Sequence, residues 1–175
     1  MVTSLSDFFR TTLSKGHDYI TVKEERTHIE SYLEIQQFRY QDILDYEIQM
    51  DEEIYGYIIP KLTLQPLVEN ALYHGIKNKR GKGKILITGK KQGDKIIFQV
   101  IDNGKGMTEE ELNSLRKKMA GTDTGDEAKG FGVSNVNQRI KYYYGEEYGV
   151  FFESKENEGT NATIIIAAKN IQLLS

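Results

Sequence analysis

The chain has 175 residues, of which 38% are hydrophobic and 28% are charged, and its formal net charge is -3. This length can supply one core, or a small domain with a helical appendage, and the acidic balance argues against general nucleic-acid binding, which needs a basic surface. The absence of cysteine excludes disulfides and thiolate metal sites, and no stretch reaches the roughly 18 apolar residues that a membrane span requires.

The first part of the chain, to about Gln41, is predicted to be helical. One short helix is indicated by apolar residues at helical spacing, with Gly16 suited to end it: Leu5, Phe8, Phe9 and Leu13. Thr21-Val22-Lys23-Glu24 is a capping box and predicts a longer second helix. That helix has a broad, largely apolar face, formed by Ile29, Tyr32, Leu33, Ile35, Gln36, Phe38 and Tyr40. Two partners for this face stay open: the rest of this chain, or a helical hairpin in a dimer.

Beyond Tyr40 the pattern changes to the alternation of a half-buried strand, residues 44–50. A loop is expected over residues 51–56. Residues 61–75 are predicted to form a helix with a buried apolar side, and Pro66 lies near its start, where a proline costs little.

The second half of the sequence predicts two pairs of strands around two helices. The strands are residues 84–91 and 95–102, then 148–154 and 161–168; the helices are residues 109–118, opened by a second capping box at Thr108, and 133–144. Residues 120–130 are rich in Gly, Thr and Asp and should form a mobile loop. The predicted fold class is α+β: a two-layer α/β sandwich with a mixed, mostly antiparallel sheet and an N-terminal helical segment.

Asp102 ends a strand on the face that Ile96, Phe98 and Val100 share. A carboxylate at the edge of a core needs a hydrogen-bond donor. Asp102-Asn103-Gly104 could be a simple turn, which is the commoner reason for such a sequence, or Asp102 could accept from an amino group of a ligand.

Two pairs of glycines flank the predicted mobile loop. Gly104 and Gly106 follow a strand, and Gly130 and Gly132 precede a helix whose free N–H groups could bind a phosphate. Neither a P-loop nor a Rossmann fingerprint is present.

Asn70 and His74 are four residues apart and therefore share a helix face. The amide oxygen of Asn70 suits a hard cation such as Mg²⁺. The alternatives are a buried amide bonded to the backbone and a histidine favoured by a helix C-terminus. The basic run over residues 77–84 is interpreted as a mostly solvated loop, and a role in attracting phosphate is the alternative.

Together these segments resemble the ATP-binding domain shared by histidine kinases, gyrase, the Hsp90 chaperones and MutL, called the Bergerat or GHKL fold. Residues 67–75 resemble its N box, 102–107 its G1 box and 130–132 its G2 box, and Gly159-Thr160 resembles its final element. The resemblance covers residues 60–168.

The resemblance implies a nucleotide site and a role for each matching residue. Asp102 would bind the adenine amino group, with Thr160 supporting it through water, and Asn70 would coordinate Mg²⁺ on the phosphates. Residues 120–129 would form a lid. The full set implied to contact ATP is Asn70, His74, Asp102, Gly104, Gly106, Met107, Gly130, Phe131, Gly132 and Thr160.

Two further features narrow the resemblance. The ATPase branches of this superfamily carry a glutamate base four residues before the N-box asparagine, where this chain has Pro66, and Glu69 lies on a different helix face. A kinase needs no such base. The sequence of residues 61–76, KLTLQPLVENALYHGI, resembles that of sensor kinases of the LytS/YesM type. Residues 4–16, 21–25 and 32–36 resemble the same kinases.

That subclass implies a two-component sensor kinase that moves the γ-phosphoryl of ATP to a histidine. The acceptor lies in an Asn-Pro-His-Phe motif, and His17, His28 and His74 all lack that context. Residues 1–41 would thus be the end of the dimerisation and phosphotransfer region and residues 42–170 the catalytic domain, in a fragment inactive in autophosphorylation by itself. Implied partners are the upstream acceptor helix, a response regulator and a second copy in a homodimer, in the cytoplasmic part of a membrane sensor. The alternatives are a serine-phosphorylating regulator of the anti-sigma kind and a non-catalytic ATP-binding module.

Overall fold

The computed structural model describes residues 18–121 and 131–170. The predicted first helix with Gly16, most of the predicted lid, and the predicted site residue Gly130 lie outside the described residues. The prediction for His17 lies outside them as well.

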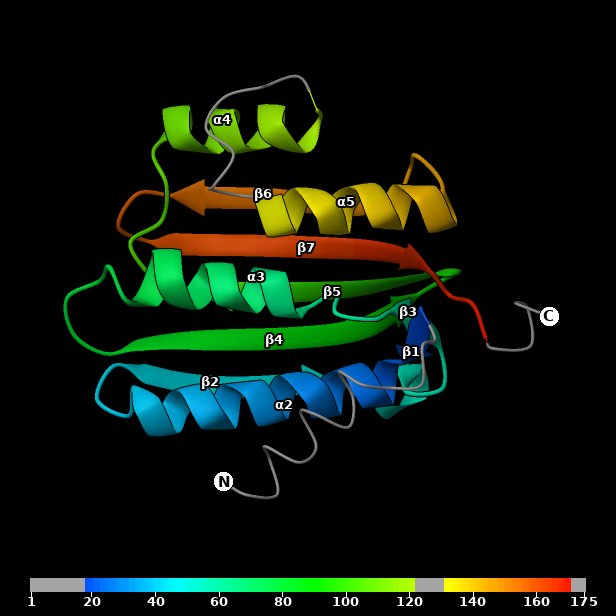
Figure 1. The fold of residues 1–175 in the computed structure, drawn as a ribbon, viewed down its shortest axis with the longest axis horizontal. Coiled ribbons are helices and arrows are strands. Elements are labelled where there is room, and N and C mark those ends of the chain that lie inside the picture. Colours follow the sequence, from blue (N-terminus) through cyan, green and yellow to red (C-terminus); the bar gives the residue numbers. More distant parts are fainter. Residues whose placement is uncertain (1–17, 122–130, 171–175) are drawn as a thin grey trace.

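A five-stranded sheet forms the centre of the described fold (Figure 1). Its strands lie in the order β2-β4-β5-β7-β6. Every neighbouring pair is antiparallel except β2 and β4, which are parallel. The predicted mixed, mostly antiparallel sheet is therefore confirmed, with these bounds: β2 Leu44–Met50, β4 Gly83–Gln92, β5 Lys95–Asp102, β6 Gly149–Lys155 and β7 Gly159–Ala167.

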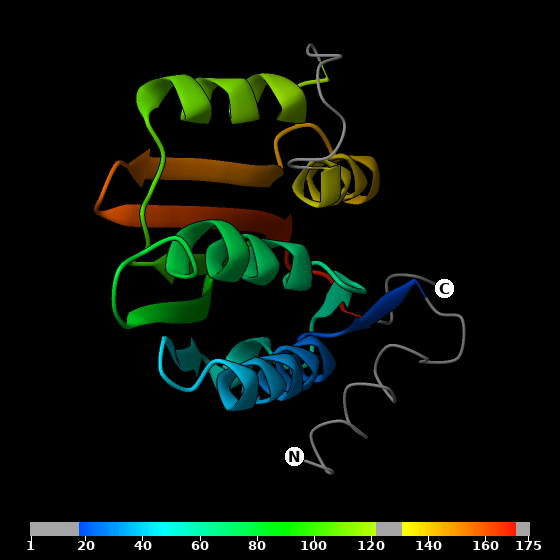
Figure 2. The same ribbon diagram turned by 60° about the vertical axis from the view of Figure 1, so that its left-hand side comes forward.

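The helices gather on one face of this sheet, which makes the two-layer sandwich that the sequence predicts (Figures 1 and 2). Helix α2 (Val22–Arg39) lies over the β2 end, α3 (Gln65–Asn70) over the middle, and α5 (Phe131–Tyr144) over β6 and β7. Helix α4 (Glu109–Met119) lies beyond the β6 edge. Both predicted capping boxes are present: Thr21 with Glu24 opens α2, and Thr108 with Glu111 opens α4.

The core lies between the sheet and these helices. Ile96, Phe98 and Val100 point into it from β5, because side chains alternate along a strand. From α2, Ile29 and Leu33 are fully buried in the same core, so the rest of this chain covers that part of the helix. Phe38, which the sequence places on the same apolar face, is 63% exposed, so the described part of this chain does not cover the face that far.

A second, two-stranded sheet closes the end of the fold near the start of α2. Strand β1 (Tyr19–Thr21) pairs antiparallel with β3 (Ile58–Pro60). The predicted loop over residues 51–56 contains a 3-10 helix, Glu52–Ile54. Sequence reasoning missed these elements because segments of three residues are too short to display a period.

The predicted helix over residues 61–75 begins later than expected and changes its geometry. Leu62 has a φ of 61°, which no right-handed helix allows, so α3 starts at Gln65. After Asn70 the chain continues as a π-helical turn, η2 (Ala71–Ile76). We call α3 and η2 together the helical rail.

Candidate functional site

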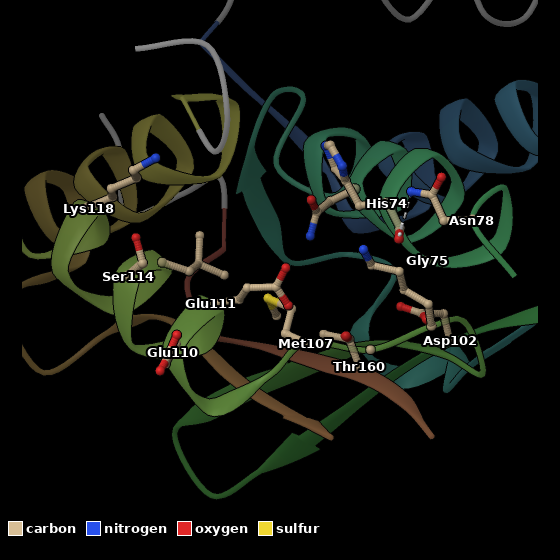
Figure 3. Close-up of a pocket in the computed structure, with 14 residues that line it drawn as sticks. His74, Gly75, Asn78, Asp102, Met107, Glu110, Glu111, Ser114, Lys118 and Thr160 are labelled. Atoms are coloured by element: carbon tan, nitrogen blue, oxygen red, sulfur yellow. Dashed lines mark hydrogen bonds between the residues drawn. The ribbon is translucent and has the colours of Figure 1, made fainter. Parts of the chain in front are cut away.

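A cavity of about 520 Å³ opens between the helical rail and α4, with β5 and β7 below it (Figure 3). Asp102 and Thr160 lie at its floor, His74 projects from the rail, Asn78 comes from the turn just after the rail, and Glu111 and Lys118 come from α4. The complete lining is Asn70, His74, Gly75, Asn78, Asp102, Lys105, Gly106, Met107, Glu110, Glu111, Ser114, Leu115, Lys118 and Thr160.

Asp102 and Thr160 stand directly opposite each other in the antiparallel β5–β7 pair. The Asp102 side chain is 6% exposed, and its Oδ1 accepts the Gly104 N–H at 2.8 Å. Burial raises the pKa of this carboxyl from 3.8 to about 6, although the N–H groups of Gly104 and Thr160 and the charge of Lys79 lower it. The sequence left open a simple turn or a ligand acceptor at Asp102; the structure shows both an Asx-type turn and a carboxylate that borders a cavity.

Glycines allow three backbones to meet around Asp102. A Cβ on Gly159, where φ is 119°, would lie 2.0 Å from the Asp102 carbonyl oxygen, and one on Gly75 would lie 2.6 Å from Asp102 Oδ1. A Cβ on Gly104 would lie 2.3 Å from the Gly75 carbonyl carbon. Gly104 therefore packs the loop onto the rail and is not among the residues that line the cavity.

The loop after β5 is tied to the final hairpin by Ser154. Its Oγ accepts the Met107 N–H at 2.9 Å, donates to the Gly159 carbonyl at 3.0 Å and hydrogen-bonds Thr160 Oγ1 at 2.8 Å. Sequence reasoning missed Ser154, although its alternation with Val150 and Phe152 places it on the inner face of β6. Gly106, with a φ of 66°, lines the cavity beside this junction.

The rail supplies the opposite wall. Asn70 ends α3, His74 lies within η2, and both line the cavity, so the structure brings together these two predicted residues with Asp102 and Thr160. Asn78 also lines it and donates to the carbonyls of Tyr73 and His74 at 3.2 and 3.4 Å. The carboxylate of Glu69 instead accepts from Gln65 Nε2 at 2.8 Å, and Glu69 is not a lining residue.

The predicted phosphate-binding helix start is only partly described. Helix α5 begins at Phe131, and a Cβ on Gly132 would lie 3.4 Å from the Pro66 Cβ, so the start of α5 abuts the start of the rail. Gly132 is not among the residues that line the cavity.

Helix α4 provides a wall that sequence reasoning did not assign. Its contribution follows helical spacing: Glu110, Glu111, Ser114, Leu115 and Lys118. That spacing was visible in the sequence, but nothing in it distinguishes a cavity wall from a solvated helix face.

The donor set fits a cation that arrives with a phosphate. Among residues 18–121 and 131–170, no three carboxylate or imidazole side chains are close enough to form a metal site. Asn70 offers a neutral amide oxygen at the cavity wall. Mg²⁺ is often held by one or two protein groups while phosphates and water complete its shell.

Known proteins match most of the chain. Residues 60–170 match the family described as histidine kinase-, DNA gyrase B-, and HSP90-like ATPase, and residues 1–44 match the family described as histidine kinase. Sensor histidine kinase YesM of Bacillus subtilis is 34% identical over 97% of this chain, and sensor protein LytS of Staphylococcus saprophyticus is 30% identical over 98%. The chain spans 28% and 29% of the lengths of these two relatives.

Solved structures share the fold. The catalytic domain of histidine kinase ThkA superposes with a TM-score of 0.62 at 19% identity, covering 86% of this chain and 95% of that one. Histidine kinase ThkA in complex with response regulator protein TrrA gives 0.62 at 18% identity, over 96% of this chain and 48% of that one. Within the described part of the chain, no helix combines the length and apolarity needed to cross a bilayer.

Proposed function

The chain belongs to the family of histidine kinase-, DNA gyrase B-, and HSP90-like ATPases, and on that premise we propose that it is the ATP-binding catalytic domain of a sensor histidine kinase. In the longer protein, this domain transfers the γ-phosphoryl group of ATP to a histidine on an upstream helix. The observation that carries the proposal is the cavity in which Asp102 and Thr160 face each other and Asn70 forms the opposite wall.

The β5–β7 floor receives the adenine. The ionised Asp102 carboxylate accepts a hydrogen bond from the exocyclic amino group, and its backbone donors keep it in place. Thr160, held by Ser154, supports the same contact through water. Gly106 and Met107 border the base.

The rail receives the phosphates. Asn70 supplies an amide oxygen for Mg²⁺, which neutralises phosphate charge when bound, and His74 lies one turn further along the same wall. The first turn of α5, which contains Gly132, would present backbone N–H groups to a phosphate beside the rail. The chain's own work is positioning, because phosphoryl transfer requires alignment and charge stabilisation more than covalent chemistry.

Two features of the rail favour a kinase over a hydrolase. Pro66 occupies the position of the water-activating glutamate, and its ring cannot take a proton. Glu69 is engaged with Gln65 outside the cavity. A kinase has a histidine as nucleophile and needs neither group.

The longer protein supplies the remaining parts. We assign residues 1–41 to the end of the dimerisation and phosphotransfer region and residues 42–170 to the catalytic domain, in line with the two family matches. A response regulator receives the phosphoryl group next, as the ThkA–TrrA complex suggests by analogy. The full protein is a homodimer, and this domain lies on the cytoplasmic side of a membrane sensor.

Calorimetric titration with a non-hydrolysable ATP analogue and Mg²⁺ tests the proposal. The native chain should bind, and Asp102→Ala should weaken binding by roughly a hundredfold, since hydrogen bonds to charged groups are worth about 1.5–3 kcal/mol. Asp94→Ala, in the turn at the other end of β5, is the matched control and should bind like the native chain. A native chain that does not bind would favour the non-catalytic alternative, and steady ATP hydrolysis would favour the ATPase branch.

A further inference from the structure

Helix α2 contacts the helical rail through a row of buried polar side chains. Glu25, His28 and Tyr32 follow one another at helical spacing, and their exposed fractions are 0%, 0% and 7%. We call these three residues the α2 seam. Buried polar groups are costly without partners, so each member marks a specific contact.

Glu25 holds the chain where it enters the rail. Its Oε1 accepts the Leu64 N–H at 2.8 Å and its Oε2 accepts the Leu62 N–H at 3.3 Å. Leu64 directly precedes α3, which has no side-chain cap of its own. The carboxyl group therefore anchors the two residues that lead into the N-terminal end of the rail.

The same point joins a third helix. Arg139 of α5 donates to the Leu62 carbonyl at 3.2 Å, and its charge acts on Glu25. Leu62 keeps its φ of 61° between these two contacts. Burial nevertheless dominates and raises the pKa of Glu25 to about 7.

The other two members contact the rail further along. His28 Nε2 hydrogen-bonds Gln65 Oε1, and Gln65 in turn donates to Glu69. The Tyr32 side chain interacts electrostatically with that of Tyr73. The seam thus follows the rail from its start to its π-helical turn.

The contacted residues and the cavity residues form neighbouring stripes on the rail. Gln65, Glu69 and Tyr73 face the seam, whereas Asn70 and His74, each displaced by one position, line the cavity. A rotation of the rail about its axis moves both stripes together. By contrast, Asp102 and Thr160 lie on strands that the seam does not contact through these bonds.

We propose that Glu25 is a positioning residue for the phosphate half of the nucleotide site: through the α2 seam it fixes the rotation of the rail that carries Asn70 and His74. This inference rests on the proposed function. It means that the helix preceding the sheet, which family matching assigns to the histidine kinase region, sets how well the domain holds Mg²⁺-bound phosphates.

The test separates the two halves of the nucleotide. Binding of a non-hydrolysable ATP analogue is measured calorimetrically with and without Mg²⁺, well below the unfolding temperature of every variant. Glu25→Gln keeps the size of the side chain but replaces one acceptor oxygen with a donor that cannot bond a backbone N–H. Glu30→Gln, the same change at a half-exposed position of α2 that pairs with Arg26, is the matched control.

The native chain and Glu30→Gln should gain affinity from Mg²⁺, and Glu25→Gln should lose roughly tenfold of that gain while its Mg²⁺-free affinity stays within about twofold. Tyr32→Phe keeps the buried ring and should show a smaller loss of the same kind, so it serves if Glu25→Gln does not fold. Equal loss with and without Mg²⁺, or no loss in either seam variant, overturns the inference while leaving the proposed function intact. A native chain that binds no nucleotide overturns both.

Discussion

Two sides of the cavity are held in place by different means. We call the β5–β7 floor the strand wall and the side formed by the helical rail the rail wall. The strand wall is fixed by backbone geometry: the β5–β7 register sets Asp102 opposite Thr160, and Gly159 lets the two strands approach each other at the Asp102 carbonyl. The rail wall is fixed by side chains from another helix, with Glu25, His28 and Tyr32 of α2 contacting it along its length.

This difference separates a constant half of the site from an adjustable half. Backbone register cannot change by less than a residue, and a slip would reverse every side chain. Hydrogen bonds to a buried carboxylate respond to its protonation and to movement of the helix that carries it. Under the proposed function, the half of the site that would bind the base is therefore fixed by the sheet, and the half that would bind the phosphates can be adjusted through the preceding helix.

The strand wall should lose much of its stability when a side chain is added at a position where two backbones meet. We expect Gly159→Ala to lower the free energy of unfolding by about 3 kcal/mol or more, because the added Cβ meets the Asp102 carbonyl and the backbone needs a positive φ. Urea denaturation measures this loss. Gly56→Ala, where nothing lies within 4 Å, should change stability little. A Gly159→Ala variant that loses little unfolding free energy would show that the strand wall can adjust.

The rail wall should respond to pH through Glu25. Its pKa is raised from 4.5 to about 7 in the folded state, so the folded chain holds this proton more tightly than the unfolded chain. The resulting stabilisation is fully present below about pH 4.5 and is lost as the pH rises through 7. Between about pH 5 and pH 8, the stability of the native chain relative to Glu25→Gln should fall by on the order of 2 kcal/mol.

Glu30→Gln should follow the native curve in the same urea experiment, because that carboxylate is half-exposed rather than buried. Parallel curves for the native chain and Glu25→Gln would mean that Glu25 does not titrate in this range.

Base recognition should weaken in acid. The pKa of Asp102 is raised to about 6, and only the ionised carboxylate can accept from an amino group with either oxygen. Adenosine, which has no titrating phosphate, should therefore bind roughly tenfold more weakly at pH 5 than at pH 7.5. An NMR titration of the native chain against Asp102→Asn measures this, and the variant should bind weakly with no such dependence on pH.

A single side-chain hydrogen bond in the strand wall should matter least. Ser154→Ala removes the acceptor of the Met107 N–H, and we expect a loss of about 1 kcal/mol in unfolding free energy with the register unchanged. Urea denaturation together with the Mg²⁺-nucleotide titration checks this. A loss as large as that of Gly159→Ala would mean that Ser154, rather than the glycines, holds the strand wall.

The sequence predicted the strand wall better than the rail wall for a physical reason. Alternation places Asp102 in phase with Phe98 and Val100, and this local pattern survives into the structure. The hydrogen bond between Glu25 and Leu64 joins residues 39 positions apart, so no local periodicity in the sequence predicts it. The late start of α3 has the same origin, because the positive φ of Leu62 is sustained by contacts from α2 and α5.

The resemblance to known motifs supplied what local patterns could not. It brought Asn70, Asp102 and Thr160 into one predicted site, and the structure places all three around one cavity. It gave no indication of Ser154 or of the α4 wall, because these residues lie outside the motifs. Their roles depend on which elements meet in space.

The position of Asp102 and Thr160 also bears on how the chain reaches its folded state. Strands β4 and β5 close on the short turn at Gly93 and Asp94, and β6 and β7 close with Lys155 paired to Gly159, so each hairpin can form locally. Asp102 and Thr160 lie on the β5–β7 line where these two hairpins join across a long stretch of sequence. The floor formed by Asp102 and Thr160 therefore exists only after β5 and β7 have paired, and a nucleotide that binds there, as proposed, would stabilise the folded chain over forms that lack this pairing.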